Sequence, residues 1–192
     1  YFHDSIGDFR EAERRIITMN TIPEVINNYN VYGGSSEEKF VGISGEITLP
    51  SFDMTTHTMT GAGILGEIEN PVVGQFKSTD MEIPFRMLSE PALSLMRTDQ
   101  PMTLTIRGSQ QYTDAESGAT SFTQVRVVIR GKCKGFEGGK MKIAEETDTK
   151  VKAELWYILI EVGGKTLLEL DKLNSVYVVD GVDMLAEVNK YC

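Results

Sequence analysis

The chain has 192 residues, of which 41% are hydrophobic and 24% charged, so it is long enough to enclose a core and has the composition of an ordinary globular domain. Its formal net charge of −9 excludes a protein that is basic overall, and its lysines and arginines form no cluster that could follow a phosphate backbone. No apolar run approaches the ~20 residues of a membrane-spanning helix, and the amino end lacks the layout of a secretory signal, so we expect a soluble chain without stable membrane binding.

The first eighteen residues mix acids and bases and are followed by Met19, which resembles a fresh start. We therefore treat 1–18 as a leader, tag or extension and expect 19–192 to form a single domain. The two cysteines are Cys133 and Cys192. We expect both to be reduced thiols, because Cys192 is the last residue, where a chain usually frays.

Alternation of apolar and polar residues predicts most of the strands. At 41–49, the apolar positions Val41, Ile43, Ile47 and Leu49 share one face of a half-buried strand. The same period of two recurs at 102–108 and at 123–132, and the polar sequence between them, SQQYTDAESGATS, predicts the tip of a long hairpin.

A further strand is predicted to begin at 151 with one apolar face, formed by Val151, Ala153 and Leu155. Trp156, Ile158 and Ile160 then occupy the face that was polar, so we expect this strand to end buried on both sides. Gly163 and Gly164 predict a tight turn back, because glycine accepts the positive φ of a two-residue hairpin loop. Residues 174–179 predict another strand.

Two short helices are predicted. Ser89 can cap the sequence EPALSLMR, in which Leu88, Ala92, Leu95 and Met96 give an apolar stripe. Asp180 precedes GVDMLAEVNKY, with Asp183 in the first turn. The expected fold is mainly β, an antiparallel sandwich or partly closed barrel with one or two short α-helices.

The sequence GAGILGEIEN contains Gly61, Gly63 and Gly66 in the G-x-G-x-x-G spacing of a dinucleotide-binding fingerprint. That motif needs a buried strand before it and a helix after it, since the pyrophosphate binds at the N-terminus of the helix. A threonine-rich segment precedes the glycines, and Pro71 follows too soon for a useful helix. The pattern therefore favours a glycine-loosened strand or bend, and we expect no cofactor.

No catalytic or metal-binding group is predicted. The histidines, His3 and His57, are far apart in polar surroundings, and the acidic residues show no ligand spacing. Cys133 lacks a titratable partner, and Ser109 lacks the glycines of a nucleophile elbow. We therefore expect a protein that is not an enzyme.

The segment PSFDMTTHTMT, residues 50–60, is too long and too rich in β-formers for an ordinary surface turn. It could be a flexible excursion or an arm that pairs with a neighbouring subunit. The expected two-sided burial near Trp156 and the long strand edges without proline favour the second interpretation, because exposed edges invite pairing with another chain.

Seven segments, in order, closely resemble the major tail tube protein of contractile-tailed bacteriophages: IPEVINNYNVY, GISGEITLP, GAGILGEIENPVVGQF, IPFRML, LTIRGSQQY, VRVVIRGKCKGFEGGKMK and LDKLNSVYVVDGVDML. The resemblance runs from Met19 nearly to the end, and the leader departs from it. It implies a β-barrel-like subunit with a flanking helix, six of which form a ring, with rings stacked into the inner tube of a contractile sheath. Related tubes occur in phage-tail-like bacteriocins, and the fold is shared with the tube protein of type VI secretion.

By its order of segments, the resemblance implies that the amino-terminal segment 22–30 and the hairpin 50–67 reach neighbouring subunits and rings, with the glycines at the bend where the arm returns to the barrel. Trp156 is added for its expected burial on both sides. The candidate inter-subunit contact residues are Ile22, Pro23, Val25, Asn27, Tyr29, Phe52, Met54, Thr56, His57, Thr58, Met59 and Trp156.

The implied partners are further copies of the chain, the sheath protein, and baseplate and tail-terminator proteins, with tape measure protein or DNA passing through the lumen without specific binding. The implied location is the virion tail or a tail-like particle assembled in the bacterial cytoplasm. A net acidic chain suits a conduit for a polyanion, because each phosphate contact adds affinity and drag. The alternative is a monomeric β-sandwich ligand-binding module, which would favour exposed aromatic residues, whereas the chain has one Trp.

Overall fold

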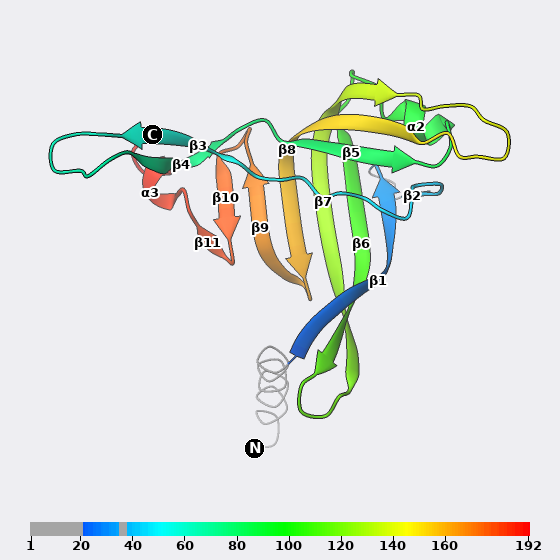
Figure 1. The fold of residues 1–192 in the computed structure, drawn as a ribbon, viewed down its shortest axis with the longest axis horizontal. Helices are drawn as coiled ribbons and strands as arrows, with labels where there is room; N and C mark the ends of the chain where they lie inside the picture. The colour runs from blue at the N-terminus through cyan, green and yellow to red at the C-terminus, as the bar shows by residue number, and fades with distance from the viewer. Residues whose placement is uncertain (1–20, 35–37) are drawn as a thin grey trace, which may run out of the picture.

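A computed structural model describes residues 21–34 and 38–192, and these form two antiparallel sheets and two short helices. The large sheet has nine strands in the order β11-β10-β9-β8-β7-β6-β1-β2, with β5 paired to β8 off this path (Figure 1). Its strands are β1 (Thr21–Gly33), β2 (Glu38–Phe40), β5 (Asp80–Phe85), β6 (Met102–Asp114), β7 (Thr120–Glu137), β8 (Thr149–Val162), β9 (Lys165–Asp171), β10 (Val176–Val179) and β11 (Val182–Asp183). The second sheet is the hairpin of β3 (Met54–Met59) and β4 (Ile68–Phe76). The mainly antiparallel β architecture with two short helices is as predicted.

The predicted hairpins of the sheet centre are confirmed. β6 and β7 pair without interruption from Met102↔Gly131 to Thr113↔Thr120, so much of the polar sequence assigned to the tip is itself paired. Asp114 closes the turn by accepting hydrogen bonds from the Glu116 and Ser117 amides. β8 returns into β9 through Gly163 and Gly164, both at positive φ.

A β-bulge at Trp156 divides β8 into two halves. Arg130 of β7 pairs with Tyr157 and Gly131 with Leu155, so Trp156 has no partner in β7. The first half of β8 pairs with β5, and the second half with β9.

The bulge also corrects the expected burial of β8. The inserted residue shifts the alternation by one position, so Ile158 joins Val151, Ala153 and Leu155 in the core, and Ile160 packs against it. Trp156 is half-buried and lies outside the buried core. The prediction of a strand buried on both sides is therefore wrong.

The predicted strand at 41–49 is also wrong. Residues 41–53, which we call the strap, cross the sheet on their way to β3 and form a single β-bridge, Ile43↔Phe85 (Figure 1). Gly42 takes a φ of 96°, and its carbonyl accepts a hydrogen bond from the Arg86 amide, which turns the chain away from strand pairing. Ile43 and Ile47 still pack on the core, so the strap covers part of it.

The first predicted helix is confirmed as α2 (Glu90–Ser94), although the Ser89 side chain makes no capping hydrogen bond. Ala92 and Leu95 are buried, whereas Leu88 and Met96 are exposed.

The second predicted helix, after Asp180, is wrong in its first half. Asp180 and Gly181 both have positive φ and form a tight turn into β11, as Asp-Gly favours in hairpins. Only α3 (Ala186–Asn189) is helical.

Candidate assembly surfaces

The most prominent surface feature is the hairpin Met54–Phe76, here called the arm, which projects sideways from the large sheet (Figure 1). Its strands pair with each other and form a sheet of their own. Gly61, Gly63 and Gly66 lie in the connection between the two strands, and Gly63 and Gly66 have positive φ. The glycines therefore form the distal tip of the arm, and not its return to the sheet as expected.

The root of the arm is fixed to the carboxyl-terminal part of the chain. The Phe76 and Tyr177 rings meet edge to face with their centroids 5.0 Å apart. Gly74 lies against the Leu185 side chain. The Lys77 amide donates a hydrogen bond of 2.9 Å to the Asp53 carbonyl, which ties together the two chain segments that enter and leave the arm.

The surface of the arm is apolar and acidic. Met59 pairs with Ile68 across the two strands, and both are exposed, as are Val72 and Val73. Leu65 at the tip is fully exposed. The only Asp, Glu, Lys or Arg residues between 54 and 76 are Glu67 and Glu69. A fixed arm with exposed aliphatic side chains is typical of an interaction surface.

The outer part of β1 is a second candidate surface. β2 pairs with β1 only at Val31–Gly33, so residues 22–30 pair with β6 on one side alone. Register shifts place bulges at Glu24 and Asn27, and both side chains bind Gln111: Asn27 donates to Gln111 Oε1 at 2.9 Å, and Gln111 Nε2 donates to Glu24 at 2.5 Å. The bulges and the open edge leave Ile22, Val25 and Ile26 about half exposed.

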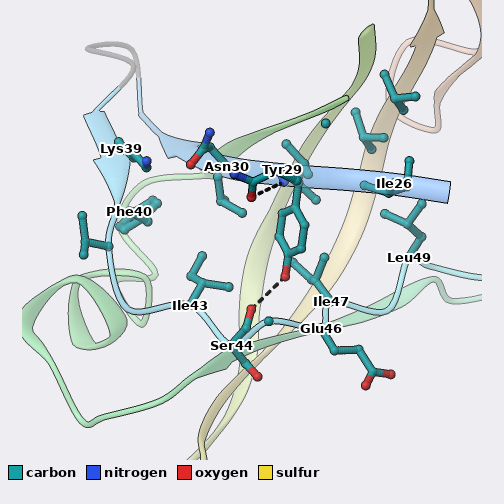
Figure 2. Close-up of a pocket in the computed structure, with 18 of the residues that line it drawn as sticks. Ile26, Tyr29, Asn30, Lys39, Phe40, Ile43, Ser44, Glu46, Ile47 and Leu49 are labelled. Carbon is teal, nitrogen blue, oxygen red and sulfur yellow. Dashed lines mark hydrogen bonds between the residues drawn. The ribbon is translucent and has the colours of Figure 1, made fainter. Parts of the chain in front are cut away.

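A groove of about 640 Å³ lies between β1 and the strap (Figure 2). We call it the Tyr29 groove. The Tyr29 side chain crosses the groove, and its hydroxyl donates a hydrogen bond of 2.8 Å to the Ser44 carbonyl (Figure 2). Burial, and to a lesser extent the Glu46 carboxylate, raises the pKa of Tyr29. The groove is lined mainly by the aliphatic side chains Ile26, Ile43, Ile47, Leu49, Ile106 and Val125.

The sheet face opposite the core carries arginines that are held by neighbours in the same chain. Arg126 pairs with Glu161 at 2.8 Å. Arg107 lies over the Tyr32 ring at 4.9 Å, and Arg130 lies over the Tyr157 ring at 4.6 Å. Contacts of this kind shield part of each guanidinium from other anions.

Within 21–34 and 38–192 there is no group of three or more His, Cys, Asp and Glu side chains that could hold a metal ion. His57 is exposed on the arm, and the Cys133 thiol is half-buried and donates to the Gly135 carbonyl at 3.4 Å. None of the helices in the same residues has both the length and the apolar character to cross a bilayer.

The glycine fingerprint lies between two paired strands, an arrangement without the helix that a dinucleotide requires. The family model of the phage tail tube protein FII matches residues 23–191, which is most of the chain. The chain belongs to this family. The resemblance seen in the sequence is thereby confirmed, and the family is one of structural components of phage tails and not of enzymes.

Two individual similarities accompany this family match. The tail tube protein of Escherichia phage P2 is 26% identical over 149 residues, which cover 77% of this chain and 86% of that protein. The second is to a chain in the cryo-EM structure of the anti-feeding prophage baseplate, solved with sixfold symmetrisation. The two chains are 13% identical, and the match covers 75% of this chain and 98% of that chain with a TM-score of 0.41.

In this tail tube chain the predicted contact residues fall into two separate groups. Ile22, Pro23, Val25 and Asn27 are exposed on β1, and Thr56, His57, Thr58 and Met59 are exposed on the arm. The others are at least partly engaged within the chain: Tyr29 in the groove, Phe52 and Met54 against the core, and Trp156 in the bulge. Their role between subunits stays a prediction.

The sequence analysis missed β4 and its exposed residues Ile68, Val72 and Val73. The register shift in the arm breaks the alternation that would have predicted the strand. The Tyr29 groove was missed because it depends on how the strap crosses the sheet.

Proposed function

We propose that this chain is the repeating subunit of the inner tube of a contractile phage tail or tail-like particle, in which six copies form a ring and rings stack around a channel for DNA or effector passage. The observation that carries the proposal is the arm. Its root is packed between Asp53, Tyr177 and Leu185, yet its aliphatic residues face solvent in the single chain. A structure that is rigid at its root and apolar at its surface serves a contact with another chain.

The open edge of β1 supports the same proposal. The arm and the outer part of β1 project from different sides of the large sheet (Figure 1). Contacts between unlike surfaces join copies head to tail, and such contacts close into a ring or continue as a stack.

The face opposite the core is our candidate for the channel wall. Its arginines are engaged by Glu161, Tyr32 and Tyr157, and the chain as a whole carries a net charge of −9. Such a wall would bind few DNA phosphates strongly, and weak binding suits a channel through which DNA has to pass. The sheath protein would then cover the outside of the tube, and the baseplate and terminator proteins would bind at its two ends.

The Tyr29 groove favours one alternative, a monomeric module that binds a small apolar ligand, because its volume falls in the range of ligand sites. The two functions make different predictions about assembly. Negative-stain electron microscopy of the purified chain over a range of concentrations should show sixfold rings or hollow tubes if the tube proposal holds. Compact monomers at every concentration, with and without a tail initiator complex, would overturn it.

The arm can be tested in the same experiment. Met59→Asp places a charge in the exposed Met59–Ile68 pair and should impair ring stacking while leaving the subunit folded, as judged by circular dichroism. Met59→Leu keeps the apolar surface and is the matched control. If the Met59→Asp protein stacks as the control does, the arm is not a contact between rings.

A further inference from the structure

The Tyr29 groove is an apolar opening into the core that the described residues leave uncovered. Ile106, Val125 and Val127 belong to the core side of β6 and β7, yet they line the groove. At its rim Ile26 is about half exposed and Leu49 is 47% exposed. An apolar concavity of this kind gains free energy when other aliphatic side chains fill it.

The groove also borders unpaired backbone. It is lined by residues 26–31, and of these only Val31 pairs with β2, so the edge of β1 along the groove is open to another strand. A β-hairpin that enters here could contribute both side chains to the groove and hydrogen bonds to the edge.

The arm of a second copy has the shape for this site. It is a narrow two-stranded hairpin that ends in the glycine-rich tip, where Leu65 is fully exposed and Ile64 is half-buried. Within one molecule the arm leads away from the side of the sheet on which β1 and β2 lie (Figure 1). The tip of the arm therefore lies away from the groove of its own chain (Figure 1).

The charges at the two sites are complementary at one end. Lys39 and Phe40 lie at one end of the groove, and Ile47 and Leu49 at the other, beside Glu46 (Figure 2). Lys39 is exposed and forms no ion pair with the residues that the structure describes. The arm carries Glu67 and Glu69 next to its apolar tip and has no lysine or arginine. The favourable orientation directs these two carboxylates toward Lys39 and away from Glu46.

We propose that the tip of the arm of one copy, with Ile64 and Leu65 as its anchors, occupies the Tyr29 groove of the next copy, with Glu67 and Glu69 beside Lys39. This inference rests on the proposed function, because it names the surface that the arm contacts when copies assemble. It explains why one chain has both an uncovered apolar groove and an unpartnered apolar hairpin.

Crosslinking between two differently labelled chains tests the contact directly. One chain carries Leu65→Cys and a small tag, and the other carries Leu49→Cys, both with Cys133→Ser and Cys192→Ser. After the chains are mixed under assembly conditions and oxidised, the tagged and untagged chains should join into a covalent dimer on a non-reducing gel. A matched pair in which Leu173→Cys replaces Leu49→Cys, at an exposed position on the β9–β10 turn, should give little of this product.

A charge exchange tests the orientation without cysteines. Lys39→Glu alone, or Glu67→Lys with Glu69→Lys, should raise the concentration at which tubes form severalfold, and the three changes together should restore it. Tubes that form without the specific crosslink, and without rescue by the triple change, would overturn the docking site while the tube function stands. Absence of tubes in the unmodified chain would overturn both. If the amino-terminal segment or a small ligand covers the groove instead, tubes should form but the Leu65→Cys and Leu49→Cys chains should not crosslink, and this result would also overturn the docking site.

Discussion

Gly74 in β4 and Leu185 before α3 are in such close contact that a Cβ built on Gly74 would lie 2.4 Å from Leu185 Cδ2. Gly74 also has a φ of 77°, which disfavours any other residue. We predict that Gly74→Ala lowers the free energy of unfolding by about 2 kcal/mol, from backbone strain together with displacement of Leu185. Urea unfolding measures the loss, and hydrogen exchange should show faster opening of the arm root and of residues 182–191.

Gly63→Ala at the tip of the arm is the control for backbone strain alone. Gly63 has a φ of 91°, but nothing lies within 4 Å of the point that a Cβ would occupy. This substitution should therefore cost less than Gly74→Ala and should leave exchange at residues 182–191 unchanged. Equal losses in the two variants would mean that displacing the Leu185 side chain has no measurable cost and that backbone strain accounts for the whole effect.

The bulge in β8 brings the two strands so close at Gly131 of β7 that a side chain does not fit there. A Cβ on Gly131 would lie 2.2 Å from the Glu154 carbonyl oxygen and 2.9 Å from the Leu155 side chain. Because a backbone atom blocks the site, Gly131→Ala should destabilise the chain by about 3 kcal/mol. Gly135→Ala, also in β7, meets only Lys152 at 3.8 Å and serves as the comparison in the same urea titration. A Gly131→Ala protein as stable as the Gly135→Ala protein would show that the sheet can relax around the bulge.

The bulge also shows how far the sequence could predict the fold. Period-two alternation predicted β6, β7 and the start of β8, because each strand has one face in the core. It failed at Trp156 because one inserted residue reverses the alternation, and the signal for that insertion is a close approach between β7 and β8 that is visible only in three dimensions. The prediction of a strand at 41–49 failed for a related reason. The apolar residues of the strap cover the sheet, but apart from one β-bridge they do not pair with it.

The candidate site was predictable in part. The length and β-forming composition of residues 50–60 favoured an arm over a flexible excursion, and the glycines predicted a bend, although that bend lies at the tip of the arm and not at its return to the sheet. What holds the arm in place could not be predicted, because Phe76 and Gly74 contact Tyr177 and Leu185, which are far away in the sequence. The groove likewise joins β1 to the strap through Tyr29 and Ser44.

Two buried threonines hold the base of the loop that connects β7 and β8. The Thr149 hydroxyl is fully buried, donates to the Gly138 carbonyl at 3.2 Å and lies 3.1 Å from the Thr147 hydroxyl. Thr149→Val keeps the shape of the side chain but leaves the Gly138 carbonyl without this donor, so we expect a loss of about 1–2 kcal/mol. Thermal or urea unfolding measures it. Thr120→Val, at an exposed strand end, should stay within experimental error of the original chain, and a similar result for Thr149→Val would refute the structural role of the hydroxyl.

The junction of β5, β7 and β8 predicts a dependence of stability on pH. Lys134 Nζ lies 2.8 and 2.9 Å from the two oxygens of Asp80 and 3.4 Å from Glu154. The hydrogen bond from Lys134 is the main cause that lowers the pKa of Asp80 below its ordinary value of 3.8, and the same bond raises the pKa of Lys134 above 10.5. The Asp80 contribution to stability is therefore complete above its ordinary pKa and is lost as the pH falls through the lowered value of the folded state. The Lys134 contribution is complete below its ordinary pKa and is lost as the pH rises through the raised value.

Asp80→Asn tests this pair. The difference in urea midpoint between the original chain and the variant should be largest between about pH 5 and 9 and should shrink at more acidic pH, where Asp80 becomes protonated in the folded state as well. Because the pair is exposed, the difference should be small and should shrink further at high salt. A midpoint difference that is the same at pH 2 as at pH 7, and insensitive to salt, would mean that Asp80 stabilises the junction through its hydrogen bond with Ser78 and its packing, and not through its charge.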